Sequence, residues 1–468
     1  MGAVGGGGDW ADGGGVGAGG AAGGGDLADG GPGVKRALGL GDLVLFNLAA
    51  VTSTRTLAAA AHTGSGSVWL WVPACVLFFV PSALCVAALS RKMPEEGGLY
   101  VWTRKSFGPW HGFLCGTCYW LNNLFYFPSL LLAGAAMSAY TLGERGAAVS
   151  EMPVYALTLS VAVLWGVTLL NIRGLSAGKW LGNLGGLSTF ATGGLVVALA
   201  LVALAMGKPA TAFDWSFPSE WDKLNFWPQI AFAFGGLELG AVMGGEVHRP
   251  ERTIPRAAWL SGALITGFYL AGTVGLLVLL RPEAVSPVTG LTQAAAAGGG
   301  LLGFAWLSPL TALLLAVGIF GQFSVWMAGS ARLPLVLGID RFLPASFARP
   351  HERFGTPWVA LLFQATGCTV FLLVMHAGEN LRTGYQLLVD MTVITYFIPF
   401  VYLFGAAWRQ RRSWAPVAGL AVTLAAIGLS FVPPGSAEQP WVFVAKLVGG
   451  TAAMVGFARF WYGRSATA

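Results

Sequence analysis

The chain has 468 residues, of which 55% are hydrophobic and only 10% are charged, with a formal net charge of +6. Ordinary globular proteins carry about 25% charged residues, so this composition excludes a water-soluble enzyme of this length. The mean hydropathy of +0.66 and the 12% of aromatic residues are typical of a protein that faces lipid. Basic residues recur as small groups between apolar runs, which argues against a nucleic-acid surface.

The first 33 residues form a low-complexity segment of mostly Gly, Ala and Asp. Such a segment cannot bury enough apolar surface to offset the entropy lost on ordering, and it lacks the apolar core of a secretory signal. We therefore expect residues 1–33 to be a disordered, Gly-rich cytoplasmic tail. A single membrane domain follows over residues 34–468.

Twelve segments are long and apolar enough to cross a membrane, since a spanning helix needs about 20 residues. In chain order they are residues 41–62, 66–90, 112–143, 152–172, 180–207, 226–247, 257–280, about 301–331, 354–375, 383–408, 413–437 and 440–462. The uncharged run 284–331 exceeds the length of one span. Pro287 and Gly298–Gly300 predict an external loop in its first part, so that the eighth span begins near Leu301.

The distribution of basic residues predicts the orientation. With the N-terminus in the cytoplasm, cytoplasmic segments hold 20 of the 27 lysine and arginine residues, and external segments hold 5. Cytoplasmic loops carry an excess of Lys and Arg, so we expect both termini in the cytoplasm. The five cysteines lie within apolar runs, and we expect them to be free thiols.

Two spans contain sequences that interrupt a helix. The first span carries five consecutive hydroxyl or charged residues, Thr52 to Thr56, and β-branched Thr and backbone-bonding Ser weaken a helix. The sixth span carries Gly235-Gly236 beside Glu238. First and sixth are corresponding positions in two halves of five helices, about 41–207 and 226–408, with two further helices at about 413–462. Paired interruptions of this kind predict an inverted repeat with a substrate site at the membrane midplane.

Three motifs resemble one family. They are PEEGGLYVW at residues 94–102, followed by Phe107-Gly108-Pro109; GEVHRPERTIPR at residues 245–256; and DRFLP at residues 340–344, followed by FGTP at residues 354–357. Together they are similar to the amino acid–polyamine–organocation (APC) superfamily of permeases. The resemblance implies an all-α integral membrane protein with 12 transmembrane helices. It also implies a 5+5 inverted repeat of the LeuT type, in which helices 1 and 6 are broken.

The resemblance also implies roles for individual residues. The glycine-rich break of helix 1 in the family corresponds to Ser53-Thr54-Arg55, where both glycines are replaced and Arg55 offers a guanidinium for a substrate carboxylate. Glu238 corresponds to an acid linked to protonation. A lysine that mimics sodium in some members corresponds to Thr189, so that device does not transfer. The candidate substrate-binding residues are Ser53, Thr54, Arg55, Phe127, Phe232, Phe234, Gly235, Gly236 and Trp326, and the candidate coupling residues are Glu238 and Asp390.

Structural roles remain open alternatives for these residues. A salt bridge between Arg55 and Glu238 would lower the cost of placing charges inside the membrane. The aromatic residues are equally explained as core packing, and Asp390 as a structural hydrogen bond. Glu246, near the cytoplasmic end of helix 6, is expected to pair with an arginine.

The family resemblance predicts a secondary active transporter in the plasma membrane that moves an amino acid by proton- or sodium-coupled symport or by exchange. A polyamine transporter is the alternative, for which Glu238 would anchor the cation. A membrane enzyme is disfavoured because the chain has no HExxH, GxSxG or clustered histidine motif, and a channel because no repeated pore motif is visible. We expect a small-molecule substrate, the lipid bilayer and a coupling ion as partners, and no cofactor or metal. The oligomeric state stays open.

Overall fold

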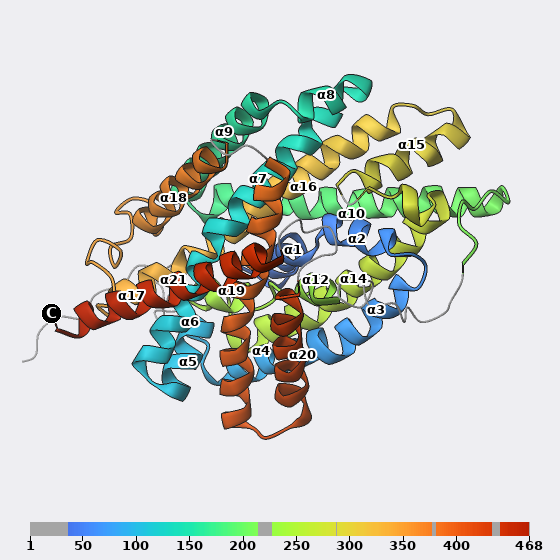
Figure 1. Ribbon diagram of the computed structural model, residues 1–468. Coiled ribbons are helices and arrows are strands. Elements are labelled where there is room, and N and C mark those ends of the chain that lie inside the picture. The colour runs from blue at the N-terminus through green and yellow to red at the C-terminus, as the bar shows by residue number, and fades with distance from the viewer. Residues whose placement is uncertain (1–35, 214–226, 287, 377–380, 433–439, 468) are drawn as a thin grey trace, which may run out of the picture.

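The computed structural model describes residues 36–213, 227–286, 288–376, 381–432 and 440–467, and most of these residues are helical. The expected tail, residues 1–33, lies outside the described residues. Figure 1 shows the helices packed side by side in one bundle, with the interrupted first helix near its middle.

The helices of the first half cover the five predicted spans and their connections. They are α1 (Leu40–Val51), α2 (Thr54–His62), α3 (Ser67–Ala74), the π-helix η1 (Cys75–Phe79), α4 (Val80–Lys92), α5 (Leu99–Phe107), α6 (Pro109–Leu121), α7 (Asn123–Tyr140), the 3-10 turn η2 (Gly143–Arg145), α8 (Gly146–Ser150), α9 (Pro153–Ile172) and α10 (Leu175–Ala205).

The second half continues in the same way. Its elements are α12 (Trp227–Phe232), α13 (Leu239–Val242), η3 (Gly244–Glu246), α14 (Pro250–Leu279), η4 (Pro282–Ala284), α15 (Gly290–Leu302), α16 (Leu307–Ser330), α17 (Arg332–Ile339), α18 (Trp358–His376), α19 (Leu381–Gln410), α20 (Trp414–Ser430) and α21 (Pro440–Thr467).

Each of the twelve predicted spans therefore contains a helix or an interrupted set of helices. Among the described residues, six helices are long and apolar enough on their own to cross a membrane, and the bent pair α1–α2 makes a seventh. The fold class is confirmed as all-helical and membrane-spanning. The full count of twelve crossings stays a prediction.

The connection expected as an external loop before the eighth span is helical in part, and its external position stays a prediction. The structure has the helix α15 there, with Leu291 and Ala294 fully buried, packed against α10 and α16. A run of four alanines at 294–297 outweighs the glycines, because alanine is the strongest helix former. The Gly298–Gly300 run lies in the last turn, and Gly303 ends the helix with φ +74°, a left-handed conformation that suits glycine.

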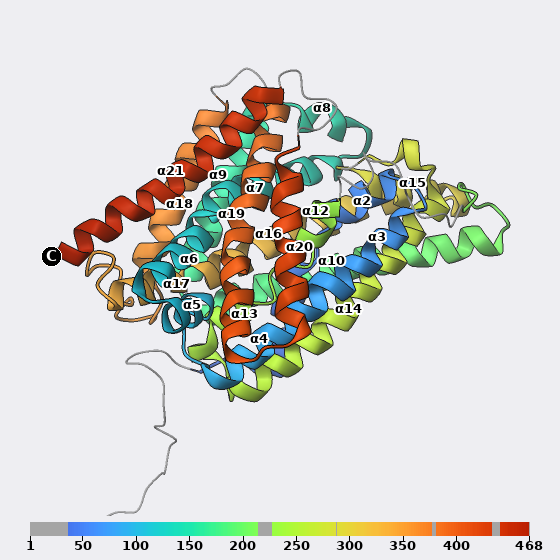
Figure 2. The same ribbon diagram turned by 60° about the horizontal axis from the view of Figure 1, so that its bottom comes forward.

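The helix pairs of the two halves correspond. In the first half α10 packs along α16 and α1 packs against α14, while in the second half α19 packs along α6 and α7, and α12 packs against α3. Helices α9 and α18, the fourth of each half, pack on each other. Figure 2 shows α19 and α20 side by side in front of this core. These reciprocal pairs are what an inverted repeat of five helices predicts.

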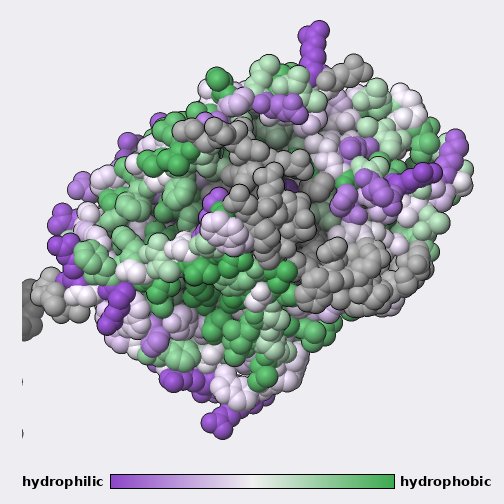
Figure 3. Space-filling view, viewed as in Figure 1, coloured by the Kyte–Doolittle hydropathy of each residue, from purple (hydrophilic) through white to green (hydrophobic). Residues whose placement is uncertain are grey.

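The surface of α20 faces outward with apolar side chains. Trp414, Val417 and Leu424 are each more than half exposed. In Figure 3 hydrophobic residues spread over the face that carries α19 and α20, and hydrophilic residues gather toward the rim. Such a continuous apolar face is costly in water and is explained by contact with lipid.

The family motifs meet at the end of the bundle that carries α5. Gly98 has φ +39°, and a Cβ there would lie 2.9 Å from the backbone of α13. The Gly97 N–H donates to the carbonyl of Val242 at 2.9 Å. The segment before α1 joins the same point, because the Leu38 carbonyl accepts from the His248 N–H at 2.9 Å. Gly98 is needed for the close approach to α13. Two segments, the one before α5 and the one before α1, are thus bonded to the end of the sixth span.

Candidate substrate site

The first helix break is confirmed at Thr52 and Ser53. Helix α1 ends at Val51, α2 begins at Thr54, and the two are bent by 44°. Ser53 is extended (φ −110°, ψ 105°), and its side chain accepts a hydrogen bond from the Thr56 N–H. Serine is a preferred residue at this N-cap position, which explains why a new helix starts here.

The backbone groups of this break are bonded to side chains from α14 and α16. The Ala50 carbonyl accepts from Trp326 Nε1 at 2.8 Å and from Gln322 Nε2 at 3.0 Å. Gln322 Nε2 also lies 3.4 Å from the Thr52 carbonyl. An interrupted helix leaves such groups without intrahelical partners, and here neighbouring helices supply them.

Tyr269 of α14 connects the first break to the second. Its hydroxyl accepts from the Ser53 N–H at 2.9 Å. The same oxygen lies 3.0 Å from the Val51 carbonyl and 2.9 Å from the Ala233 carbonyl, either of which can accept its proton. The two breaks are therefore neighbours, as the inverted repeat predicts.

The second break lies between Phe232, the last residue of α12, and Leu239, the first of α13. Gly236 has φ +118°, which non-glycine residues rarely adopt. At Gly235 a Cβ would lie only 2.5 Å from the Tyr396 ring. The glycine pair thus permits both the turn and the close approach of α19.

Glu238 lies at the end of this turn and is 1% exposed. Its Oε1 accepts hydrogen bonds from the hydroxyls of Tyr119, at 2.8 Å, and Tyr396. Its Oε2 accepts from the Gly236 N–H at 3.1 Å. A buried carboxylate is tolerated when it is hydrogen-bonded in this way. In this structure the hydrogen bonds to the Glu238 carboxylate come from two tyrosines and the turn itself, and a salt bridge with Arg55 stays a prediction.

Aromatic side chains from four spans surround Glu238. Trp326 lies between three tyrosines, with ring centroids 6.0 Å from Tyr119, 5.4 Å from Tyr126 and 5.8 Å from Tyr396. Phe232 completes the group, 5.1 Å from Tyr396 and 6.5 Å from Tyr126. We call these five residues the aromatic cluster. The structure thus brings together Phe232, Trp326 and Glu238 among the predicted residues.

Two of the predicted aromatic residues lie elsewhere. Phe127 is fully buried and packs edge-on against Phe323, with centroids 5.0 Å apart. Phe234 packs against Trp71 and Tyr269, at 5.8 and 5.3 Å. Both contribute to the core between helices. For Phe127 and Phe234, core packing describes the contacts better than substrate binding does.

Arg55 and Thr54 line a separate cavity of about 270 Å³. Its other walls are apolar residues of α7 and α16, with Val288 and Leu291. Arg55 is the second residue of α2. Asp390 lies on α19, and its side chain is outside what the structure describes.

The sequence did not single out Tyr119, Tyr126, Tyr396, Tyr269 and Gln322. Each places a hydroxyl or an amide in the middle of an otherwise apolar span. A buried tyrosine or glutamine needs a hydrogen-bond partner, and this need is the signal that was available. The partners of Gln322 and Tyr269 are four backbone carbonyl groups, and Tyr119 and Tyr396 share one acid, Glu238. All of these partners belong to the breaks.

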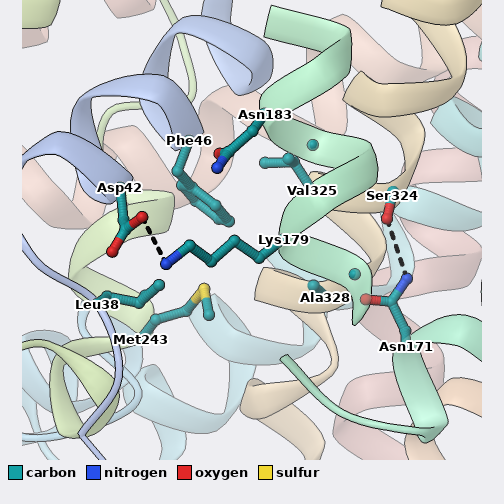
Figure 4. A pocket seen from close by; sticks show the side chains of 12 residues that line it. Leu38, Asp42, Phe46, Asn171, Lys179, Asn183, Met243, Ser324, Val325 and Ala328 are labelled. Atoms are coloured by element: carbon teal, nitrogen blue, oxygen red, sulfur yellow. Dashed lines mark hydrogen bonds and ion pairs between the residues drawn. The ribbon is translucent and has the colours of Figure 1, made fainter. Parts of the chain in front are cut away.

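A second cavity, of about 390 Å³, lies among α1, α10 and α16 (Figure 4). Lys179 Nζ forms an ion pair with Asp42 Oδ1 at 2.6 Å, with 33% and 25% of the two side chains exposed. On the opposite wall Asn171 donates to Ser324 at 3.2 Å. The ion pair joins the start of α1 to α10.

A charge cluster lies at the α5 end, where the sixth span ends. Arg332 binds Glu246 through Nε and Nη2, at 3.0 and 3.2 Å, which confirms the expected pairing of Glu246. Glu96 lies next to them, and its Oε1 is buried without a hydrogen-bond partner. Burial, and then the like charge of Glu246, raise the pKa of the Glu96 carboxyl to about 7, although Arg332 opposes the shift.

Two interrupted helices that meet in an apolar bundle, with a buried acid and aromatic side chains at their breaks, define a membrane transporter. The family model described as amino acid permease matches residues 38–453. The chain belongs to this amino acid permease family.

Individual relatives agree with this assignment. The chain is 26% identical over 444 residues to an uncharacterized transporter of Legionella pneumophila, covering 89% of this chain and 94% of that protein. It is 29% identical to the polyamine transporter PUT1 of Oryza sativa (70% and 59% covered) and 24% identical to the serine/threonine exchanger SteT of Bacillus subtilis (75% and 78% covered). Among solved structures, MhsT in complex with L-phenylalanine matches with a TM-score of 0.58 and 13% identity, covering 92% of this chain and 99% of that chain. This last likeness supports the fold alone.

Proposed function

We propose that the protein is a secondary active transporter of amino acids. The observation that carries this proposal is the position of Glu238, which is buried between both helix breaks and within the aromatic cluster. A carboxylate and aromatic faces together attract an ammonium group. Arg55 lines a separate cavity in this structure, and we propose that its guanidinium meets the substrate carboxylate when this cavity and the aromatic cluster come together during the transport cycle. An α-amino acid carries both groups.

A polyamine is the second candidate substrate. The acid and the aromatic cluster suit a cation without any carboxylate, and the similarity to a rice protein named a polyamine transporter favours this alternative. Arg55 opposes it, because a guanidinium repels a second ammonium group. The charge of residue 55 therefore distinguishes the two candidates.

Glu238 is the group that we propose to exchange a proton during the cycle. As a carboxylate it accepts three hydrogen bonds. A protonated Glu238 would have to donate one of them, and a tyrosine hydroxyl can turn to accept it because it is both donor and acceptor. The tyrosine pair can thus accommodate either state without leaving a group unpaired.

The protein is proposed to lie in the plasma membrane with both termini in the cytoplasm. The α5 end, which carries Arg91, Lys92, Arg104 and Lys105, would then face inward, in accord with the excess of basic residues on that side. A cysteine at Gly143 should react with a membrane-impermeant thiol reagent in intact cells. A cysteine at Ser346 should react only after permeabilisation, and the opposite pattern would overturn the orientation.

Uptake into proteoliposomes tests the substrate. Saturable uptake of a labelled amino acid, inhibited by other amino acids more than by their decarboxylated amines, is the expected result. Arg55→Lys keeps the charge but loses the bidentate geometry, so it should weaken amino acids more than amines. An equal loss for both would remove Arg55 from the site. Uptake of polyamines alone would favour the second candidate.

A further inference from the structure

A cleft of about 990 Å³ lies between α4, α14, α19 and α20, and none of its described lining residues belongs to a helix break. Two arginines line this cleft. Arg91 is the last residue but one of α4, and Arg411 lies in the short connection between α19 and α20. Figure 2 shows this connection next to α4. The cleft therefore lies at the α5 end of the bundle, apart from the proposed substrate site.

The two arginines give the cleft a positive charge. Both are exposed, and neither forms an ion pair with an acidic residue in the part of the chain that the structure describes. By contrast, Arg104 at the same end is paired with Asp340. The described lining of the cleft contains no acidic side chain. Ser413, which precedes α20, makes no side-chain cap hydrogen bond, so the partial positive charge of that helix N-terminus adds to the potential. The cleft thus has the charge that attracts an anion.

The cleft also has an apolar side, which a small anion would leave uncovered. Trp259 of α14 and Trp414 of α20 line it, and both side chains are exposed. Tryptophan is enriched at the depth of lipid headgroups, because its ring is apolar at one end and polar at the other. The exposed side chains of Leu264 and Val417 continue the apolar surface along the same two helices. A ligand that fits both regions has an anionic head and apolar chains.

We propose that the cleft binds the headgroup of an anionic phospholipid, whose phosphate contacts Arg91 and Arg411 and whose acyl chains lie along α14 and α20. Guanidinium groups form bidentate hydrogen bonds with phosphate, and basic pockets between transmembrane helices at the cytoplasmic side suit anionic headgroups. The bound lipid connects α20, which follows the two halves of five helices, to α4 in the first half and to α14 in the second. This site is separate from the proposed transport function, and binding and unfolding measurements test it without transport.

The wild-type protein in a neutral detergent gives the first test. Palmitoyl-oleoyl phosphatidylglycerol and the phosphatidylcholine with the same chains are added separately, and bound lipid is counted by native mass spectrometry. Phosphatidylglycerol should bind at least about tenfold more tightly, and it should raise the thermal unfolding midpoint more, because a ligand of the folded state stabilises that state. Equal binding of the two lipids would overturn the proposal.

Glycerol phosphate distinguishes a lipid from a free anion. It carries the same anionic group as phosphatidylglycerol but lacks the acyl chains, so it should leave the unfolding midpoint unchanged at concentrations at which the lipid acts. A rise equal to that given by the lipid would identify a site for small anions and would overturn the assignment to a phospholipid.

The double variant Arg91→Gln/Arg411→Gln gives the third test. Each basic residue near an anionic lipid surface contributes to the attraction, so the double variant should bind phosphatidylglycerol about tenfold or more weakly than wild type. Its affinity for phosphatidylcholine should stay within about twofold. An unchanged preference for phosphatidylglycerol would contradict the proposal.

Arg173→Gln/Arg349→Gln is the matched control. Both arginines are exposed and lie outside the described lining of the cleft, and their replacement changes the net charge by the same amount. The control should keep the wild-type affinity, and a loss equal to that of the first variant would show a general surface attraction instead of a site. Should the first variant fail to fold, Arg411→Gln alone, in the exposed connection, should still weaken phosphatidylglycerol about threefold or more, and an unchanged affinity there would overturn the proposal.

Discussion

Both helix breaks leave backbone groups without partners inside the helix, and the two breaks satisfy these groups in different ways. At the first, the chain contains no glycine, and side chains of α14 and α16 bond the backbone from outside. At the second, the glycine pair makes the turn, and Glu238 accepts the Gly236 N–H from within the same segment. The first break exposes acceptors that need donors, whereas the second brings an acceptor of its own.

This difference assigns a different role to each break: the first holds the backbone in position, and the second carries a group that can exchange a proton. The first break has no titratable side chain among the groups that bond its backbone in the described structure, except the phenol of Tyr269. The second has a carboxyl group at its centre. We therefore expect changes near the first break to alter stability, and changes at Glu238 to alter the dependence of transport on pH.

The largest effect is expected when a methyl group is added at the second break, by the substitution Gly235→Ala. In Gly235→Ala the new Cβ would lie 2.5 Å from the Tyr396 ring, so the ring must shift away from Glu238. Overpacking costs about 1–3 kcal/mol or more, and we expect the largest loss of folded protein here. Thermal unfolding and the yield of monodisperse protein measure it. Gly267→Ala on α14, where nothing lies within 4 Å, is the control and should be neutral or stabilising.

Removing the hydroxyl of Tyr269 should affect both breaks together. Tyr269→Phe leaves the half-buried Ser53 N–H and one carbonyl without a partner. Each lost hydrogen bond costs about 0.5–1.5 kcal/mol, so the expected loss does not exceed that of Gly235→Ala. Denaturant unfolding should show this loss. The control is Tyr402→Phe, whose hydroxyl bonds His111 in a half-buried position. A loss no greater than that of the control would show that the two breaks are not joined through Tyr269.

Glu238→Gln removes the titratable proton of residue 238 but keeps most of its hydrogen bonds. The amide oxygen can still accept from the tyrosines, but the Gly236 N–H loses its acceptor, and we expect a stability loss of about 1–2 kcal/mol. The main result should be kinetic, because an amide cannot exchange a proton at this site. The pH dependence of uptake should flatten, and substrate binding should weaken without being abolished, because the aromatic cluster remains while the charge that attracts the ammonium group is lost. A normal pH profile in a well-folded variant would end the proton-coupling role of Glu238.

The smallest expected effect on transport lies in the charge cluster at the α5 end, where the second broken helix ends, because among the described residues this cluster contacts neither break. The pKa of Glu96 is raised to about 7, above the ordinary value of about 4.3 for an unfolded chain. The folded state therefore binds this proton more tightly, and the contribution to stability falls as the pH rises from about 4.3 through 7.

Glu96→Gln should remove this part of the pH dependence and unfold at a higher temperature than wild type at pH 8. Glu95→Gln changes the adjacent residue, which is half exposed and paired with Lys105, and should keep the wild-type slope. Unfolding midpoints between pH 5 and 8 measure both variants. Parallel curves for wild type and Glu96→Gln would contradict the raised pKa.

The sequence predicted the features that depend on local composition. The hydroxyl run of Thr52 to Thr56 and the Gly235-Gly236 pair located both breaks, and the position of Glu246 at a helix end suggested its arginine. The sequence did not predict which side chains enter the site where this depends on the rotation of a helix about its axis. Tyr126 and Phe127 are adjacent, so they point about 100° apart on a helix, and only Tyr126 enters the aromatic cluster.

The sequence could not distinguish Phe232 from Phe234 for the same reason. The two residues are two positions apart at the second break and face different neighbours. A span that is apolar all round carries no amphipathic pattern to indicate which side faces the site. The rotation is set by contacts with helices far away in sequence, such as α19 against α6 and α7. A single sequence cannot supply those contacts.

The Tyr269 hydroxyl has one hydrogen and two carbonyl oxygens within reach, one on each broken helix. It can serve Val51 or Ala233 at a given moment, but not both. Moving that hydrogen requires only a rotation about the C–O bond, with no change in backbone or ring position. When one broken helix draws away, the hydrogen can remain with the other, so the separation of the two helices need not leave this hydroxyl with an unmet donor. The Tyr269 hydroxyl can therefore keep a full hydrogen bond to one broken helix while its contact with the other is broken, and only a rotation about the C–O bond is needed to change partners.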